Sequence, residues 1–201
     1  ELGVGRIDLS RMTAFDDELG LDEAELTSQY LNKDHDFRNG AISVRRRVIA
    51  KSWDGNFHIS VTAMNSVFGG INVDYIADLY NVSSTLWWFQ SVSGADEDYL
   101  LGYAGGYGSA DSCYGLGTTG SNNAYSGDCP ICIGFNTASN KYLLNFVEFD
   151  SRVVFVNLYG SYFGSWDQEN DLLRAPLANP YIPGNSRYGC GLTAVWHKFL
   201  G

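Results

Sequence analysis

Two uninterrupted apolar runs constrain the fold of this chain more than any other feature. The first, Asp98-Tyr99-Leu100-Leu101-Gly102-Tyr103, leads directly into glycines, and the second, Arg152-Val153-Val154-Phe155-Val156-Asn157-Leu158-Tyr159, leads into Gly160. Strands that are apolar at consecutive positions are typical of sheets buried on both faces, as in a parallel sheet covered by helices. We therefore predict an α/β fold with a mainly parallel sheet flanked by helices.

Other segments with strand and helix patterns alternate along the chain, which supports the α/β class. A helix is expected from Glu23 to His35, because Asp22 and Glu25 form a capping-box-like start and apolar residues follow at helical spacing. Further helices are expected over 74–80 and 168–178, a turn-rich acidic stretch over 16–20, and strands over 2–7, 42–50 and 191–195. We expect one domain over 1–201, as part of a longer chain.

A segment rich in glycine, tyrosine and serine, residues 104–140, separates the two apolar runs. It is long for a structureless connection, so we interpret it as a loop insertion, either a functional loop or an inserted excursion. Tyrosine provides contact area at a low cost in conformational entropy, which favours binding loops. The predicted recognition surface consists of four tyrosines: Tyr103, Tyr107, Tyr114 and Tyr125.

Charge and hydrophobicity exclude two classes of partner. The 201 residues are 45% hydrophobic and carry 23 acidic against 13 basic side chains, a formal net charge of −10. Neutralising phosphates requires a surplus of Lys and Arg, so we expect no nucleic-acid or anionic-membrane binding, and Arg45-Arg46-Arg47 is interpreted as pairing with surface carboxylates. No apolar run approaches the roughly 20 residues of a spanning helix, so no membrane span is expected.

Four cysteines point to structural disulfides in a secreted protein. They are Cys113, Cys129, Cys132 and Cys190, and three pairings are open. A redox role for Cys129-Pro130-Ile131-Cys132, free thiols and a metal site are alternatives, although a four-thiolate zinc site normally uses two such pairs. No cofactor is expected. Ca²⁺ could bind acidic runs such as 167–171, but none follows the twelve-residue calcium loop.

Candidate catalytic residues are few, because the chain has three histidines. His35 lies in the solvated run 33–36 at a helix end, where the helix dipole explains it without chemistry. A nucleophile would be Ser161 or Cys113, with His197 or His58 as its base. Ser161 follows a strong strand, but its surroundings do not form a G-x-S-x-G elbow.

Several segments in order resemble gingipain-type cysteine peptidases, a family found in large secreted bacterial proteins. The resemblance covers about residues 1–165. It begins with Val4-Gly5-Arg6-Ile7, which precedes a helix ending Tyr30-Leu31-Asn32-Lys33. It continues with three strand-like segments: Val48-Ile49-Ala50 before Asp54, residues 99–106 and residues 153–159. It implies a caspase-like fold in which a cysteine thiolate, assisted by a histidine, attacks a peptide carbonyl. Gly105 stands where the resemblance places the histidine, and Leu158-Tyr159-Gly160-Ser161 surrounds the expected cysteine.

Three functions follow from this combination of resemblance and missing dyad. The first is an extracellular or cell-surface domain without peptidase activity that binds a protein or glycan partner or has a structural role. The second is an active extracellular hydrolase that uses one of the candidate pairs above. The third is a self-assembling extracellular subunit. The sequence does not determine an oligomeric state.

Overall fold

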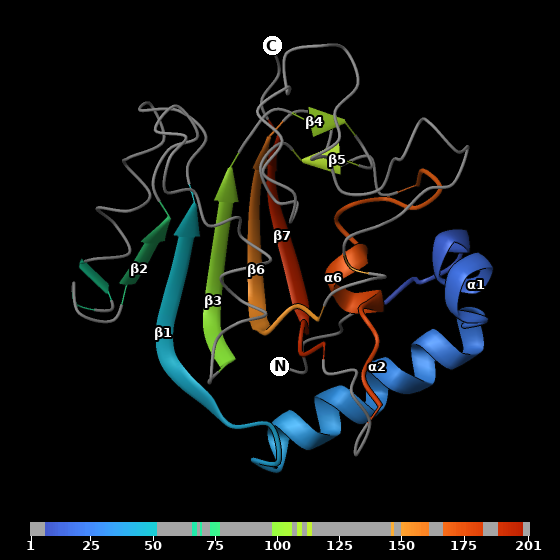
Figure 1. The fold of residues 1–201 in the computed structure, drawn as a ribbon, viewed down its shortest axis with the longest axis horizontal. Helices are drawn as coiled ribbons and strands as arrows, with labels where there is room; N and C mark the ends of the chain where they lie inside the picture. Colours follow the sequence, from blue (N-terminus) through green and yellow to red (C-terminus); the bar gives the residue numbers. More distant parts are fainter. Residues whose placement is uncertain are drawn as a thin grey trace, which may run out of the picture.

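The computed structural model contains a five-stranded parallel sheet with helices packed against it (Figure 1). It describes residues 7–51, 66–67, 69, 73–76, 98–105, 108–109, 112–113, 146, 150–160, 167–182 and 189–198. The sheet consists of β1 (Val44–Lys51), β2 (Val73–Ile76), β3 (Asp98–Gly105), β6 (Val153–Gly160) and β7 (Thr193–Lys198). Its strand order is β2-β1-β3-β6-β7, and each neighbouring pair is parallel. This confirms the predicted α/β class.

The two apolar runs form adjacent central strands, β3 and β6. In β6, Val153, Val154, Val156 and Leu158 are each at most 1% exposed. Val153, Val156 and Leu158 belong to one core cluster and Val154 to a second. Consecutive strand residues point to opposite faces, so β6 is buried on both, as its sequence predicts.

Two helices precede the sheet: α1 (Thr13–Leu19) and α2 (Glu23–Arg38). The capping box at the start of α2 is present, with the Glu25 amide donating to Asp22 Oδ1 (2.9 Å) and the Asp22 amide donating to Glu25 Oε2 (3.0 Å). In Figure 1, α2 runs below the amino ends of the strands. Buried side chains of α1 and α2, including Phe15 and Leu26, join the larger core cluster.

The remaining described elements are small. The short helix α6 (Ala175–Ala178) contacts both α2 and β7. The two-residue strands β4 (Gly108–Ser109) and β5 (Ser112–Cys113) form an antiparallel hairpin. No helix in the described ranges is long and apolar enough to cross a membrane.

Three local predictions were wrong. Most of the stretch 16–20, predicted to be rich in turns, belongs to α1, and Gly20 (φ 67°) ends this helix in the left-handed conformation that glycine adopts readily. Residues 73–76 form strand β2, because β1 offers them a parallel partner over Val48–Lys51. Residues 167–174 are mainly turns, and the helix that follows is only Ala175–Ala178. The predicted strand at 2–7 lies almost wholly outside the described residues.

Candidate functional site

The carboxyl ends of the strands form the candidate site, which we call the carboxyl edge. Gly105 of β3 is level with Tyr159 of β6, and Tyr159 is level with His197 of β7. Lys51, the last residue of β1, is level with Ala104. Neighbouring strands lie about 4.8 Å apart, so the parallel register brings residues from widely separated parts of the sequence into one row.

The strand order adds a second reason to place the site there. From β1 the chain goes to β2 on one side, and the strands β3, β6 and β7 then follow in order on the other side. The order therefore reverses between β1 and β3. In open parallel sheets, ligands bind outside the carboxyl ends of the strands at such a switch point. Lys51 and Gly105 end the two strands that border it.

The predicted catalytic residues are only partly placed. His197 lies in β7 beside β6, at the register of Tyr159, and Ser161 directly follows Gly160, the last residue of β6. Ser161 and His58 are outside the described residues. The backbone of Cys113 lies in β5, paired with Gly108. The strands β3 and β6 thus meet at Gly105 and Tyr159, positions that carry neither a histidine nor a cysteine.

The predicted recognition surface needs one correction. Tyr103 lies inside β3 and is only 6% exposed, so it belongs to the packed sheet and leaves little of its ring for a partner. Strand β3 also continues to Gly105, so the glycine-rich connection begins two residues later than its predicted start at 104. Tyr107, Tyr114 and Tyr125 are outside the described residues.

At the opposite end of the sheet lies a buried polar cluster that sequence reasoning missed. We call Lys33, Ser151, Asn179 and Cys190 the amino-edge cluster; all four are at most 1% exposed. Lys33 Nζ donates to the carbonyls of Leu177 (3.1 Å) and Asn179 (3.0 Å).

Asn179 connects this cluster to the chain before β6. Its Oδ1 accepts from the Ser151 amide (2.7 Å), and its Nδ2 donates to the Phe146 carbonyl. The amide of Cys190 donates to the Ser151 carbonyl at 3.0 Å, and its Sγ lies 3.4 Å from the same oxygen. The cluster therefore ties α2, α6 and the entries to β6 and β7 together.

Burial shifts the pKa values in this cluster. It lowers the pKa of Lys33 from 10.5 to about 7, with the neighbouring Cys190 acting in the opposite direction. It raises the pKa of the Cys190 thiol far above its usual range, with Asp98 adding to the effect. Shifted pKa values often mark active sites, but both groups are 0% exposed and hold backbone groups. We therefore assign the cluster a structural role.

An ion pair and a cation–π contact also join the strands at this amino edge of the sheet. Asp98, the first residue of β3, is 2% exposed, and its Oδ1 accepts from Arg152 Nε at 2.6 Å. The guanidinium of Arg47 lies 5.8 Å from the centre of the Tyr99 ring, within cation–π range. These contacts join β1, β3 and β6 near their amino ends.

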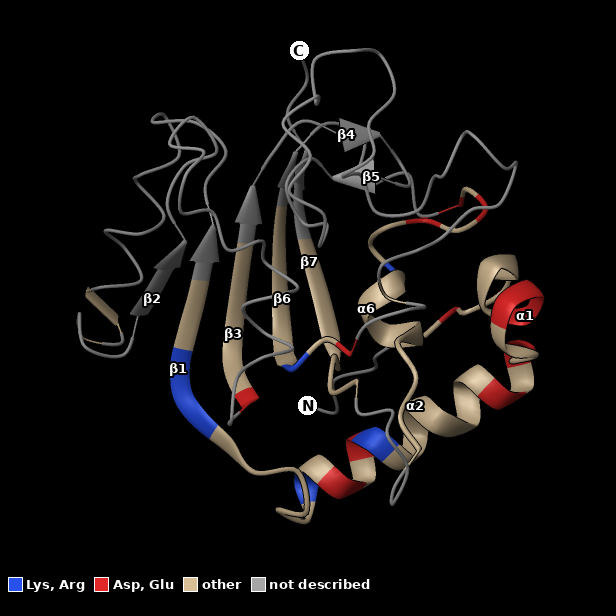
Figure 2. Ribbon diagram, viewed as in Figure 1, with Lys and Arg blue, Asp and Glu red and all other residues tan. Residues whose placement is uncertain are grey.

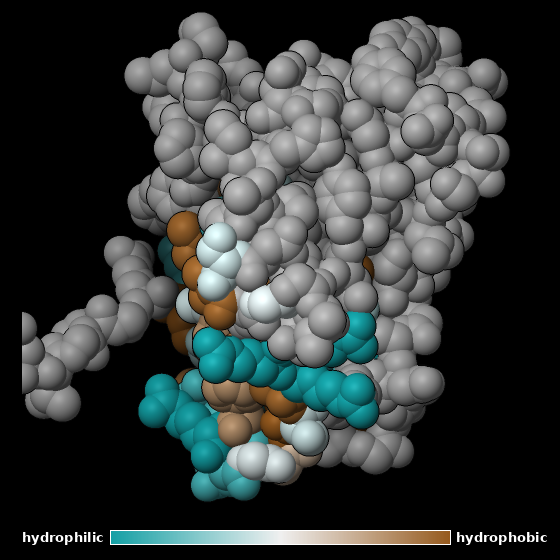
Figure 3. All heavy atoms as spheres, turned by 90° about the vertical axis from the view of Figure 1, so that its left-hand side faces the viewer, coloured by the Kyte–Doolittle hydropathy of each residue, from teal (hydrophilic) through white to brown (hydrophobic). Residues whose placement is uncertain are grey.

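Charge is unevenly distributed over the described surface. Acidic residues are frequent on α1 and α2, whereas the start of β1 carries three arginines (Figure 2). On the side of β1, the described residues are a mixture of hydrophilic and hydrophobic ones (Figure 3). In the described ranges, no three His, Cys, Asp or Glu side chains gather closely enough to hold a metal ion, and this includes the acidic run 167–171.

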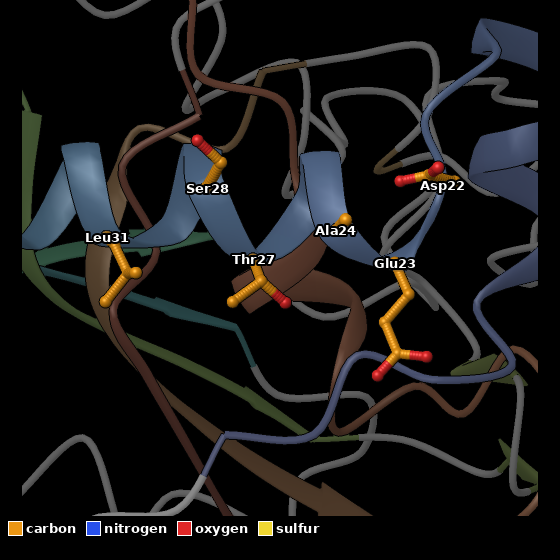
Figure 4. A pocket seen from close by; sticks show the side chains of 6 residues that line it. All are labelled: Asp22, Glu23, Ala24, Thr27, Ser28 and Leu31. Atoms are coloured by element: carbon orange, nitrogen blue, oxygen red, sulfur yellow. The ribbon is translucent and has the colours of Figure 1, made fainter.

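An open groove of about 660 Å³ lies along the first half of α2 (Figure 4). It is lined by Asp22, Glu23, Ala24, Thr27, Ser28 and Leu31. None of these residues was predicted to take part in function, and none lies at the carboxyl edge. His35, one turn further along α2, is exposed, with Nε2 2.9 Å from Asn39 Nδ2, in keeping with its predicted place at a helix end.

Among the four cysteines, the structure describes only the side chain of Cys190, which is a free and buried thiol. Cys129, Cys132 and the side chain of Cys113 are outside what the structure describes. Comparison with known proteins gave no match to a family model, to a curated protein or to a solved structure.

Proposed function

We propose that this chain is an extracellular, gingipain-like domain without the peptidase dyad, and that it binds a protein or glycan partner at the carboxyl edge. The observation that carries the proposal is the register of β3 and β6. Gly105 is level with Tyr159 where the resemblance would require a histidine near the nucleophile strand. Glycine has no group that can accept or donate a proton, so this pair of strand ends cannot supply the family's base.

The binding role is supported by the position of the glycine- and tyrosine-rich segment. It leaves β3 at Gly105, beside the switch point between β1 and β3. A binding segment that starts at this position would lie where α/β sheets bind their ligands. Tyr107, Tyr114 and Tyr125 are the proposed contact residues, and Tyr103 is left out because it is buried.

The test compares binding by three forms of the chain on a glycan array and against extracellular protein preparations. Replacing Tyr107, Tyr114 and Tyr125 together with alanine should reduce binding at least tenfold, about 1.4 kcal/mol. Changing the exposed residues Glu23 and Leu31 of α2 to alanine is the control and should leave binding unchanged. Equal binding by the tyrosine variant and the unmodified chain would contradict the proposal.

A hydrolase is the second candidate, because one observation favours it. His197 is level with Tyr159, and Ser161 follows Tyr159 by two residues. A fluorophosphonate probe labels an activated serine in the native protein but not in the denatured protein. Stoichiometric native labelling that Ser161→Ala and His197→Ala each abolish would establish the hydrolase and overturn the non-catalytic proposal.

A further inference from the structure

The segment before and at the start of α1 and the segment after β6 are held together by a network of hydrogen bonds. We call residues 8–14 and 167–174 with the bonds between them the latch. The Asn170 amide donates to the Arg11 carbonyl (3.0 Å), and Asn170 Oδ1 accepts from the Ala14 amide (2.9 Å). Thr13 Oγ1 donates to Glu169 Oε1 at 2.6 Å. Two segments more than 150 residues apart in sequence are thereby joined.

Arg174 is the central donor of the latch. It is 6% exposed, and its Nη1 donates to the Ser10 carbonyl at 2.5 Å while its Nη2 donates to the Gln168 carbonyl. Its third donor, Nε, is buried and has no acceptor. The guanidinium therefore joins both segments, while its buried Nε–H has no acceptor.

Asp171 supplies the matching unused acceptor. Its side chain is 0% exposed; Oδ1 accepts from the Leu173 amide at 2.9 Å, but Oδ2 is buried without a partner. A buried carboxylate oxygen without a hydrogen bond is costly, so burial favours the protonated acid. Burial raises the pKa of Asp171 from 3.8 to about 7, opposed by Arg174 and by backbone donors and assisted by Asp167.

Arg174 Nε and Asp171 Oδ2 are not bonded to each other in the observed arrangement, so pairing them requires the guanidinium to move from the Ser10 and Gln168 carbonyls. With Asp171 neutral, the guanidinium can hold the Ser10 and Gln168 carbonyls, as observed. Once the proton of Asp171 leaves to solvent, the buried negative charge attracts the free Nε–H. A charge-assisted bond of this kind is about twice as strong as a neutral one. We propose that the latch is a pH-sensitive switch in which ionisation of Asp171 draws Arg174 away from Ser10 and releases residues 8–14.

Other charges around the latch do not remove this competition. Asp8 Oδ1 lies 3.9 Å from Arg174 Nη1, and its side chain is 26% exposed. Arg11 Nη1 donates to the Asp167 carbonyl (3.2 Å), and Asp167 and Glu169 are exposed. Arg174 is thus the one buried cation of the latch within the described residues.

Hydrogen exchange of the full chain tests the proposal, with protection factors corrected for the intrinsic pH dependence. The amides of Ala14 and Asn170 both donate across the latch. Their protection should fall about tenfold between pH 6 and pH 8, because a group one pH unit above its pKa is about tenfold more ionised than neutral. Asp171→Asn keeps a neutral side chain and should remove this pH dependence, whereas Asp167→Asn should retain it.

Constant protection in the unmodified chain, or an unchanged pH dependence in Asp171→Asn, would overturn the proposal. Should Asp171→Asn fail to fold, the unmodified chain provides its own test by NMR. The carboxyl carbon of Asp171 should then titrate with the same midpoint as the Ala14 and Asn170 amides. A midpoint below pH 5, or amide signals that do not follow the carboxyl, would refute the switch.

Discussion

Replacing Lys33 with methionine should change how the stability of the protein depends on alkaline pH. Lys33 is 0% exposed, and its amine donates to two backbone carbonyls at the end of α6. Burial lowers the pKa of Lys33 to about 7 in the folded protein, whereas the unfolded chain keeps the ordinary value of 10.5. A neutral amine still has two N–H groups, so it can serve both carbonyls after losing its proton.

The sign and size of the effect follow from proton counting. Between pH 7 and 10.5 the unfolded state binds one more proton at Lys33 than the folded state, so the free energy of unfolding rises with pH. The slope approaches about 1.4 kcal/mol per pH unit, and the two pKa values give a gain of about 2.5 kcal/mol between pH 7.5 and 9.5. All other titratable groups are the same in both proteins, so they cancel in the comparison.

The assay is urea denaturation of the unmodified chain and of Lys33→Met at pH 7.5, 8.5 and 9.5. The difference in unfolding free energy between the two proteins should shift by about 2.5 kcal/mol in favour of the unmodified chain as pH rises. Arg38→Met is the control, because it removes a cation from the same helix at a side chain that is 75% exposed. Parallel pH profiles for the unmodified chain and Lys33→Met would refute a buried amine that titrates near neutrality.

Two further predictions concern stability at neutral pH. Asn179→Ala should lower the free energy of unfolding by about 3 kcal/mol, because it leaves the buried Ser151 amide and Phe146 carbonyl without their partner; a loss under 1 kcal/mol in urea denaturation would count against this role. Asp22→Ala removes the acceptor of the Glu25 amide and should cost about 1 kcal/mol, measured in the same way, and an unchanged midpoint would show that the capping box is energetically unimportant.

The central sheet and the long helix could be predicted from the sequence because their signals are local and redundant. Consecutive apolar residues mark β3 and β6, and the Asp22–Glu25 pair marks the start of α2. Local sequence patterns gave wrong predictions where pairing with a distant segment decides the structure. Residues 73–76 are a strand through their pairing with β1, a contact that no local pattern contains. The acidic run at 16–18 indicated a turn, although acidic residues also favour the first turn of a helix.

The two central strands of the candidate site could be predicted from the sequence, but the residues that lie beside them could not. The meeting of Gly105 and Tyr159 follows from two apolar runs pairing in parallel, whereas the position of His197 beside Tyr159 depends on the register of a later strand. Lys33 was interpreted as part of a solvated run, yet it follows Leu26 by seven residues on the buried face of α2. Helical spacing was the signal that could have identified it, and its charge obscured that signal.

The two edges of the sheet differ in what a substitution can do. At the amino edge, the Asp98–Arg152 ion pair and the amino-edge cluster hold backbone groups and strand entries in place, so changes there act on stability. At the carboxyl edge, β1 and β3 end at the point where the strand order reverses, and the chain leaves them as connecting segments. The β3–β6 ladder runs from the Tyr99–Val153 pair to the Gly105–Tyr159 pair, so substitutions after Gly105 lie outside these paired positions. If the carboxyl edge binds a partner as proposed, the triple tyrosine variant should lose binding while its urea midpoint stays unchanged, and a loss of stability as large as that of Asn179→Ala would show that these tyrosines serve the fold instead.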